Sequence, residues 1–319
     1  MEKFEHIKEL TKPIREDLQS GAAEIALRAI TVFQSVLAGP ENNSPENLKE
    51  ALNFTVQELL NAQPAMAPLF YLCNSVLLAI SNAKTVADID KDCQDAMQSF
   101  EHTLCDSAAG IAEKVFELIP PGDLVFAYSF SSTVVSSLLN ARAKGRYFRV
   151  ACTESRPSLE GRKLAKQLSQ GNIEVIHTFD SAMSLVLPNC KAAFMGCDCL
   201  GIPGVVNKVG SFMLALACKE LKIPLYVLAG SEKIVGEDRL FEFERHERPG
   251  EEIWQTLQFD GKDGIPKGVR VLNHQFELVP LNLVTGVVTE KGVLKEKDIE
   301  KYVKTTKVHE SLKLEPVTF

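Results

Sequence analysis

Several features that would place the chain in a special class of protein are scarce or absent. Only one of the 319 residues is tryptophan, and no apolar run reaches the roughly 18 residues that a membrane-spanning helix needs. The eight cysteines are scattered and lack the paired Cys-x-x-Cys spacing of a zinc site. A net charge of −7 lacks the basic excess that nonspecific nucleic-acid binding requires.

The same absences indicate in which cellular compartment the protein is expected and which partners it is expected to lack. Residues 1–6 contain no apolar segment of the kind found in signal peptides. We therefore expect a cytoplasmic protein with reduced cysteines, without a metal, and without a membrane or a direct nucleic-acid partner. Hydrophobic residues make up 45% of the chain and charged residues 24%, which is ordinary for a globular protein.

The first 118 residues show helical periodicity and no strand signal. Apolar residues recur at helical spacing in four stretches, which are 25–37, 48–60, 69–80 and 86–118. Gly39-Pro40 ends the first stretch and Ser44-Pro45 begins the second, with proline in a first-turn position. The sequence therefore predicts a helical domain over residues 1–118.

After Ile119-Pro-Pro-Gly-Asp123 the periodicity changes to that of alternating strands and helices. Short apolar segments predict strands at 124–128, 148–153, 173–177, 192–195 and 224–229. Helical segments between them lie at 132–143, 159–170, 180–187 and 211–221. This alternation predicts an α/β domain over residues 119–319, with a doubly wound, mainly parallel sheet. No Gly-x-Gly-x-x-Gly follows the first strand, so we expect no dinucleotide cofactor.

The remaining segments of this half are less regular. The polar residues 236–270 predict a loop or a lid over the ligand crevice. Residues 276–288 predict a further strand or edge segment, and a short helix is expected near 295–303.

The stretch from Met195 to Gly210 carries the densest set of candidate site residues. Asp198 follows a buried strand, Asn207 and Lys208 lie between glycines, and a helix is expected to open at Ser211. Ligands of open α/β sheets bind beyond the carboxyl ends of the strands, and helix N-termini bind anions. The stretch therefore predicts either a pocket for a small phosphorylated ligand or a tight turn in which Asp198 only caps a helix.

Other strand ends supply further candidates. Ser129 and Ser131 follow the first strand, Arg156 follows the second, and Lys233 follows the fifth. If the strands are parallel, Arg156, Lys208 and Lys233 converge on one rim and can bind a phosphate group. Helix caps, a structural ion pair and a solvated lysine are the alternatives. His177 and the cysteines that flank Asp198 are predicted to be structural.

Three ordered motifs resemble a known superfamily. They are Thr153-Glu-Ser-Arg-Pro157, Gly196-Cys-Asp198 with Asn207-Lys-Val-Gly210, and Tyr226-Val-Leu-Ala-Gly-Ser-Glu-Lys233. They resemble the initiation factor 2B alpha, beta and delta subunits, a superfamily that also contains methylthioribose-1-phosphate isomerase and ribose-1,5-bisphosphate isomerase. Residues 63–68 and 276–292 fit as well. The resemblance implies an N-terminal helical domain, a C-terminal Rossmann-like domain, and a homodimer or higher homo-oligomer.

The isomerases of this superfamily interconvert phosphorylated aldoses and ketoses without a metal, using a cysteine after the first strand and an aspartate after the fourth. Asp198 matches the aspartate, but Ser129 occupies the cysteine position, and a hydroxyl is a far weaker acid than a thiol. The phosphate-binding Arg-Gly-Ala near the N-terminus is changed to Ser20-Gly21-Ala22. The resemblance thus implies a retained binding shell made of Gly21, Ala22, Ser129, Ser131, Arg156, Asp198, Asn207, Lys208, Gly210 and Lys233.

Three functions follow from this comparison. The first is a noncatalytic, initiation-factor-2B-alpha-like regulatory subunit that binds a sugar phosphate or nucleotide and could have a translation-factor partner. The second is a divergent aldose–ketose isomerase in which Asp198 is catalytic and Cys152 or Cys199 is a relocated thiol. The third is a structural subunit with a vestigial pocket.

Overall fold

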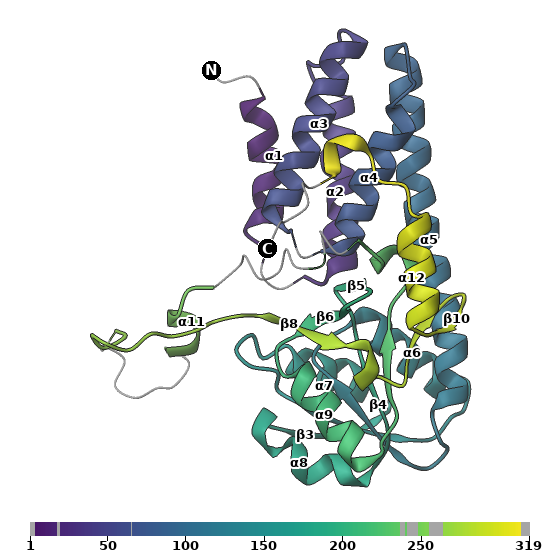
Figure 1. Ribbon diagram of the computed structural model, residues 1–319, viewed down its shortest axis with the longest axis vertical. Coiled ribbons are helices and arrows are strands. Elements are labelled where there is room, and N and C mark those ends of the chain that lie inside the picture. Colours follow the sequence, from purple (N-terminus) through teal and green to yellow (C-terminus); the bar gives the residue numbers. More distant parts are fainter. Residues whose placement is uncertain are drawn as a thin grey trace.

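The computed structural model describes residues 4–17, 20–64, 66–236, 240, 248–254 and 264–313. Helices form its first part, which stands above the rest of the molecule in Figure 1. They are α1 (Glu5–Arg15), α2 (Ala22–Leu37), α3 (Pro45–Ala62), α4 (Ala67–Ile80) and α5 (Val86–Leu118). Helix α4 packs against α2, α3 and α5, so it is buried on most sides. This position explains why its sequence is apolar almost throughout.

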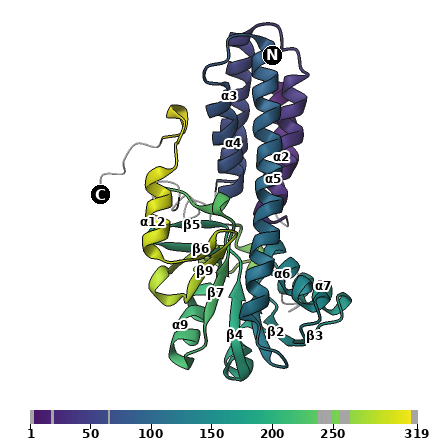
Figure 2. The ribbon, with the colours of Figure 1, turned by 90° about the vertical axis from the view of Figure 1, so that its right-hand side faces the viewer.

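Helix α5 belongs to both halves of the molecule. A capping box begins it, in which the Asp88 N–H donates to Thr85 Oγ1 at 3.1 Å and the Thr85 N–H donates to the Asp88 carboxylate at 3.2 Å. Cys93 and Phe100 on its first half pack in the helical core, whereas Val115 on its last turns packs against the main sheet. The helix runs the length of both parts in Figure 2. The division into two domains at residue 118 stays a prediction.

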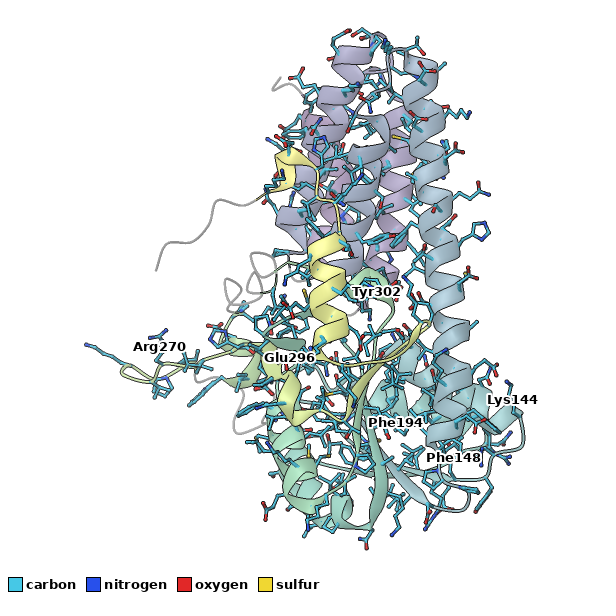
Figure 3. All side chains as sticks on the ribbon, turned by 45° about the vertical axis from the view of Figure 1, so that its right-hand side comes forward. Lys144, Phe148, Phe194, Arg270, Glu296 and Tyr302 are labelled. Carbon is cyan, nitrogen blue, oxygen red and sulfur yellow. The ribbon has the colours of Figure 1, made fainter. Side chains whose placement is uncertain are left out.

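The second part is built on a seven-stranded sheet with the order β10-β9-β7-β4-β1-β2-β3. Its strands are β1 (Leu124–Tyr128), β2 (Arg149–Thr153), β3 (Glu174–Thr178), β4 (Cys190–Met195), β7 (Leu225–Leu228), β9 (Gly286–Thr289) and β10 (Gly292–Leu294). All neighbours pair in parallel except β10, which is antiparallel to β9. Phe148 and Phe194 are buried in the core of this part (Figure 3). The predicted fold class, helices followed by a mainly parallel α/β sheet, is confirmed.

Helices lie between most of these strands along the chain, and a further helix follows the last strand. They are α6 (Ser132–Ala143), α7 (Gly161–Gln170), α8 (Met183–Val186), α9 (Ser211–Leu221) and α12 (Glu296–Thr305). The helix predicted at 180–187 is instead a short α8 between two single 3₁₀ turns. Pro188 lies in the second of these turns, where its missing N–H prevents a longer helix.

A second, three-stranded antiparallel sheet was not predicted from the sequence. It consists of β5 (Cys199–Gly201), β6 (Gly204–Lys208) and β8 (Phe276–Pro280) in the order β5-β6-β8. Paired Cys199 and Val206 face the core of the helical part, and paired Leu200 and Val205 face the core of the main sheet. The expected turn at 195–210 is therefore a hairpin that lies between the two parts (Figure 2).

Two further segments complete the described chain. Residues 248–254, which include α11 (Glu251–Trp254), and residues 264–275 form an arm that projects from the body (Figures 1 and 3). Most of the predicted lid, residues 237–239, 241–247 and 255–263, lies outside the described residues. Beyond α12 the chain returns to the helical part, where Asn74 Nδ2 donates to the Lys307 carbonyl and Asn74 Oδ1 accepts the His309 N–H. None of the helices in the described ranges has the length and apolar character of a membrane span.

Candidate functional site

The sheet order places a ligand crevice between β1 and β4. Successive strands run outward from β1 through β2 to β3, and the chain then returns to place β4 on the other side of β1. At such a switch point the two connections leave in opposite directions and open a crevice beyond the strand ends. Ser129 follows β1 directly, and Asp198 lies three residues after the end of β4.

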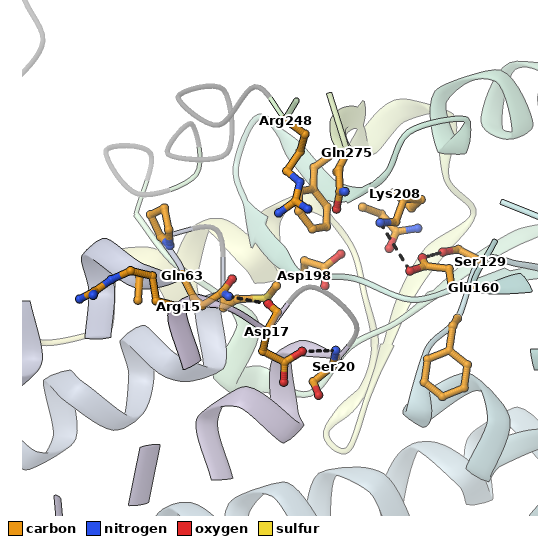
Figure 4. A pocket seen from close by; sticks show the side chains of 17 residues that line it. Arg15, Asp17, Ser20, Gln63, Ser129, Glu160, Asp198, Lys208, Arg248 and Gln275 are labelled. Atoms are coloured by element: carbon orange, nitrogen blue, oxygen red, sulfur yellow. Dashed lines mark hydrogen bonds and ion pairs between the residues drawn. The ribbon is translucent and has the colours of Figure 1, made fainter. Parts of the chain in front are cut away.

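A cavity of about 250 Å³ lies at this point, between the helical part and the α/β part (Figure 4). The following described residues line it: Arg15, Asp17, Ser20, Gly21, Ala62, Gln63, Pro64, Met66, Ser129, Phe130, Glu160, Asp198, Asn207, Lys208, Arg248, Gln275 and Phe276. The wall therefore comes from α1 and the end of α3, the α1–α2, α3–α4 and β2–α7 connections, the segments after β1 and β4, the β5–β6 hairpin, the start of β8 and the base of the arm.

Hydrogen bonds position the backbone of Asp198 in the wall of the cavity. Its N–H donates to the Val206 carbonyl at 2.9 Å, and its own carbonyl accepts the Ala67 N–H at 3.2 Å. Burial raises the pKa of Asp198 above its ordinary value, although the ammonium groups of Lys233 and Lys208 act in the opposite direction. A carboxyl group with a raised pKa in a cavity is suited to proton transfer.

Lys233 lies behind Asp198 rather than in the cavity wall. Its side chain is buried, and Nζ donates to the Cys197 carbonyl at 2.6 Å. The neighbouring Glu232 is also buried and accepts a hydrogen bond from Ser107 Oγ on α5 at 3.2 Å. Burial raises the pKa of Glu232, and Lys233 opposes that shift too. One buried ammonium group thus stabilises the ionised form of two carboxylates.

Ser129, Glu160 and Lys208 form a connected group at one end of the cavity. The Ser129 hydroxyl donates to Glu160 Oε1, and Lys208 Nζ lies 3.5 Å from Glu160 Oε2. Lys208 is only 7% exposed and its ammonium lies 5.0 Å from the centre of the Phe276 ring. No sequence pattern singles out Glu160, which lies in the connection between β2 and α7 and reaches the site through its contacts with Ser129 and Lys208.

Two arginines that were not predicted also line the cavity, and each has a carboxylate partner. Arg15 Nη2 lies 2.7 Å from Glu58, and Arg248 Nη2 lies 2.5 Å from Glu252. Gln63 fixes the segment after α1, because its Nε2 donates to the carbonyls of Ile14 and Asp17 at 2.9 Å. Gln63 belongs to the segment 63–68 that fits the superfamily resemblance, whereas Arg15 and Arg248 lie in segments with no distinguishing sequence pattern.

Five of the ten predicted ligand residues line this cavity, namely Gly21, Ser129, Asp198, Asn207 and Lys208. Besides Lys233, the structure places three others in supporting positions. Ala22 is a buried first residue of α2, and Ser131 caps α6 by accepting the Val134 N–H. Gly210 has a φ of 99° and donates its N–H to Glu277 at 2.6 Å.

Arg156 lies in a different place from the one expected. It lines a separate hollow of about 400 Å³ with Val209 and Leu272, and its Nη2 approaches the Ile253 carbonyl at 3.5 Å. The loop after β2 is turned there because the N–H groups of Ser155 and Arg156 both donate to the Asp180 carboxylate. The predicted convergence of Arg156 with Lys208 and Lys233 is therefore not what the structure shows.

The two candidate relocated thiols do not line the cavity. Cys152 is buried, and burial raises the pKa of its thiol to about 12, although His177 Nδ1 lies 3.4 Å away. Burial also raises the pKa of Cys199 well above its ordinary value. Such thiols are unreactive at neutral pH because the thiolate is the reactive form. Among the described residues, no group of three His, Cys, Asp or Glu side chains is arranged to bind a metal ion.

Comparisons with known proteins agree with this architecture. The chain is 28% identical over 291 residues to the translation initiation factor eIF-2B subunit 2-like protein of Pyrococcus furiosus, covering 91% of this chain and 96% of that protein. It is 27% identical over 297 residues to ribose 1,5-bisphosphate isomerase of Archaeoglobus fulgidus, covering 91% and 90%. The crystal structure of the Pyrococcus horikoshii OT3 translation initiation factor eIF-2B matches 92% of this chain and 99% of that one, with a TM-score of 0.76 and 27% identity.

These relatives include both translation factors and a sugar-phosphate isomerase, so they do not choose between the two activities. The match to a family is more direct, since it covers residues 18–296 and thus most of both parts. The chain belongs to the initiation factor 2 subunit family.

Proposed function

We propose that this chain is a noncatalytic, initiation-factor-2B-alpha-like subunit that binds a phosphorylated sugar or nucleotide. The main support for this proposal is the position of Ser129 and the hydrogen bond that its hydroxyl makes. Its hydroxyl stands where the isomerases have a cysteine, and Glu160 already accepts its hydrogen bond. No cysteine is among the described residues that line the cavity. The cavity therefore has the means to bind a ligand but lacks the thiol that the related reaction uses.

The basic side chains of the cavity support a phosphorylated ligand. Arg15, Lys208 and Arg248 come from three separate segments and line one space that is also lined by amide and hydroxyl side chains. Arginine and lysine side chains bind phosphate through charge-assisted hydrogen bonds. As a regulatory subunit, the protein would change the activity of a translation-factor partner when its ligand binds.

Phosphorus NMR tests whether the protein binds without catalysis. Purified protein is mixed with methylthioribose 1-phosphate, ribose 1,5-bisphosphate or a nucleoside monophosphate and followed for hours. We expect saturable broadening of at least one ligand's resonance and no new ketose-phosphate resonance. If no ligand is broadened, the binding function is wrong and a purely structural role takes its place.

One observation favours the isomerase as a second candidate. Asp198 has a raised pKa, and Glu160 offers a second carboxylate in the same cavity. Two carboxyl groups can in principle share the proton transfers of an aldose–ketose conversion. In that case new resonances would grow with the wild type and be lost in Asp198→Asn. The control Glu154→Gln, which changes an acid paired with Arg162 outside the cavity, would keep the activity.

We also propose that the protein forms a homodimer or a higher homo-oligomer. Helix α9 exposes three large apolar side chains, Phe212, Met213 and Leu216, on one face. A contiguous apolar face of this kind favours association. Light scattering after size exclusion is expected to give at least twice the chain mass for the wild type and a smaller mass for Met213→Glu. Leu27→Glu, an equally simple change on α2, is expected to keep the wild-type mass.

A further inference from the structure

Two helices of opposite surface charge, α5 and α12, lie on the same side of the molecule (Figures 2 and 3). Both contact the turn between β9 and β10. Lys114 of α5 donates from Nζ to the Glu290 carbonyl in this turn at 3.1 Å, and Lys291 Nζ lies 4.6 Å from the centre of the Tyr302 ring on α12. The turn therefore separates the two helices, and among the described residues no ion pair joins their outer faces.

The outer face of α12 is basic. Lys297, Lys301 and Lys304 are exposed, and their spacing of four and then three residues places them on one side of the helix. Ile299, on the opposite side, is fully buried. The acidic residues of α12 lie outside this face, and one of them, Glu300, pairs with Lys304 at 2.5 Å. In the described part of the chain, neither Lys297 nor Lys301 has a carboxylate at ion-pair distance.

The outer face of α5 is acidic over its first half. Asp95 and Asp106 are exposed and lie three helical turns apart, so they share one side of the helix, and the half-exposed Asp92 lies on the same side. Lys91 is the only lysine or arginine among residues 86–113. Within the described residues these three aspartates have no ion-pair partner. Both helices thus present charges that are not neutralised within the chain.

An apolar side chain accompanies the charged faces. Strand β10 is the edge of the main sheet and leads from the same turn into α12, and its Val293 is 42% exposed. An apolar centre with a polar rim is the usual composition of a protein–protein interface. The net charge of −7 makes copies of the chain repel one another on average. Association through this side would therefore require a specific match of opposite charges.

We propose that this side of the molecule binds a second copy of the chain, with α12 of each copy against α5 of the other. In a twofold arrangement every contact occurs twice, so the lysines of both copies meet aspartates at the same time. One exposed ion pair contributes at most about 1 kcal/mol, and several together give a weak contact that salt disrupts. The contact is separate from the apolar face of α9 and does not involve the ligand cavity.

Sedimentation equilibrium at about 0.01 M and about 1 M NaCl tests the contact, because the Debye length falls from about 30 Å to about 3 Å between them. We expect the wild-type mass at low salt to be about twice the mass at high salt. Lys297→Glu/Lys301→Glu is expected to abolish this increase, and so is Asp95→Lys/Asp106→Lys. All four changes in one chain should restore it, because the charges are then complementary again with exchanged signs.

Matched variants separate this contact from other effects. Lys12→Glu/Lys166→Glu makes the same change of charge at exposed lysines of α1 and α7, and its mass should respond to salt as that of the wild type does. Met213→Glu is expected to lower the mass at both salt concentrations, which distinguishes the α9 face. An equal wild-type mass at both concentrations would overturn the proposal. The chain with all four changes and an equimolar mixture of the two double variants offer the same complementarity, and failure of both to regain the low-salt mass would overturn it as well.

Discussion

The Lys233→Ala variant is expected to lose about 3–5 kcal/mol of unfolding free energy at neutral pH, the usual cost of leaving a buried charge without its partner. The substitution removes the ammonium group that opposes the raised pKa values of Asp198 and Glu232. It also leaves the Cys197 carbonyl without the hydrogen bond that Nζ donates at 2.6 Å. Denaturant unfolding followed by circular dichroism measures the loss.

The pH dependence of this loss identifies its cause. Without Lys233, the folded-state pKa values of both carboxyl groups rise further above those of the unfolded chain, so each ionised group destabilises the folded state at high pH. The deficit should therefore grow as the pH rises through the raised pKa values and shrink as the pH falls through them toward about 4. Lys233→Met should behave similarly, and the exposed Lys166→Ala should stay within about 0.5 kcal/mol of the wild type. A deficit independent of pH would contradict this account.

Gly210→Ala is expected to destabilise the protein by about 3 kcal/mol or more and to disturb the cavity. Gly210 has a φ of 99°, which costs other residues about 1–3 kcal/mol. A Cβ atom would also lie 1.9 Å from the Tyr128 hydroxyl oxygen, so this ring would have to move. Tyr128 directly precedes Ser129, and its hydroxyl donates to the Val209 carbonyl at 2.6 Å. Scanning calorimetry measures the loss as a lower melting temperature.

Gly122→Ala is the matched control for this variant. Gly122 has a φ of 82°, but a Cβ atom there would meet no heavy atom within 4 Å. The control therefore carries the backbone strain without the collision, and the difference between the two variants measures the collision with Tyr128. Equal melting temperatures for Gly122→Ala and Gly210→Ala would show that the Tyr128 ring moves aside without a loss of stability.

The sequence was sufficient for elements whose pattern is local. Helix α6 occupies the predicted residues 132–143 and α9 the predicted residues 211–221, because each has a clear start and a continuous apolar face. The β5–β6 hairpin was missed because its strands are three and five residues long and lie among glycines. Its side chains point alternately into the helical core and into the core of the main sheet. This pattern can be recognised only when the positions of both cores are known.

The composition of the site was harder to predict than the fold. Asp198 and Lys208 could be predicted as site residues because they lie near strand ends and belong to a recognisable motif. The packing of α1 brings Arg15 close to them although more than 180 residues separate them in the sequence. A contact over such a sequence separation leaves no local pattern from which it could be predicted. Arg156 shows the opposite error, because a strand end fixes where a loop begins but not where hydrogen bonds to Asp180 turn it.

The return of the chain to Asn74 has a consequence for biosynthesis. Residues 307–312 complete the surface of the helical part, with two hydrogen bonds to Asn74 and with Leu312 buried in its core. Nascent domains generally fold as they leave the ribosome, N-terminal segments first. Here the first helices emerge more than 200 residues before the segment that covers them. During translation we expect the apolar surface that Leu312 covers to remain accessible to other chains and to chaperones. It becomes buried only after residue 312 has left the exit tunnel.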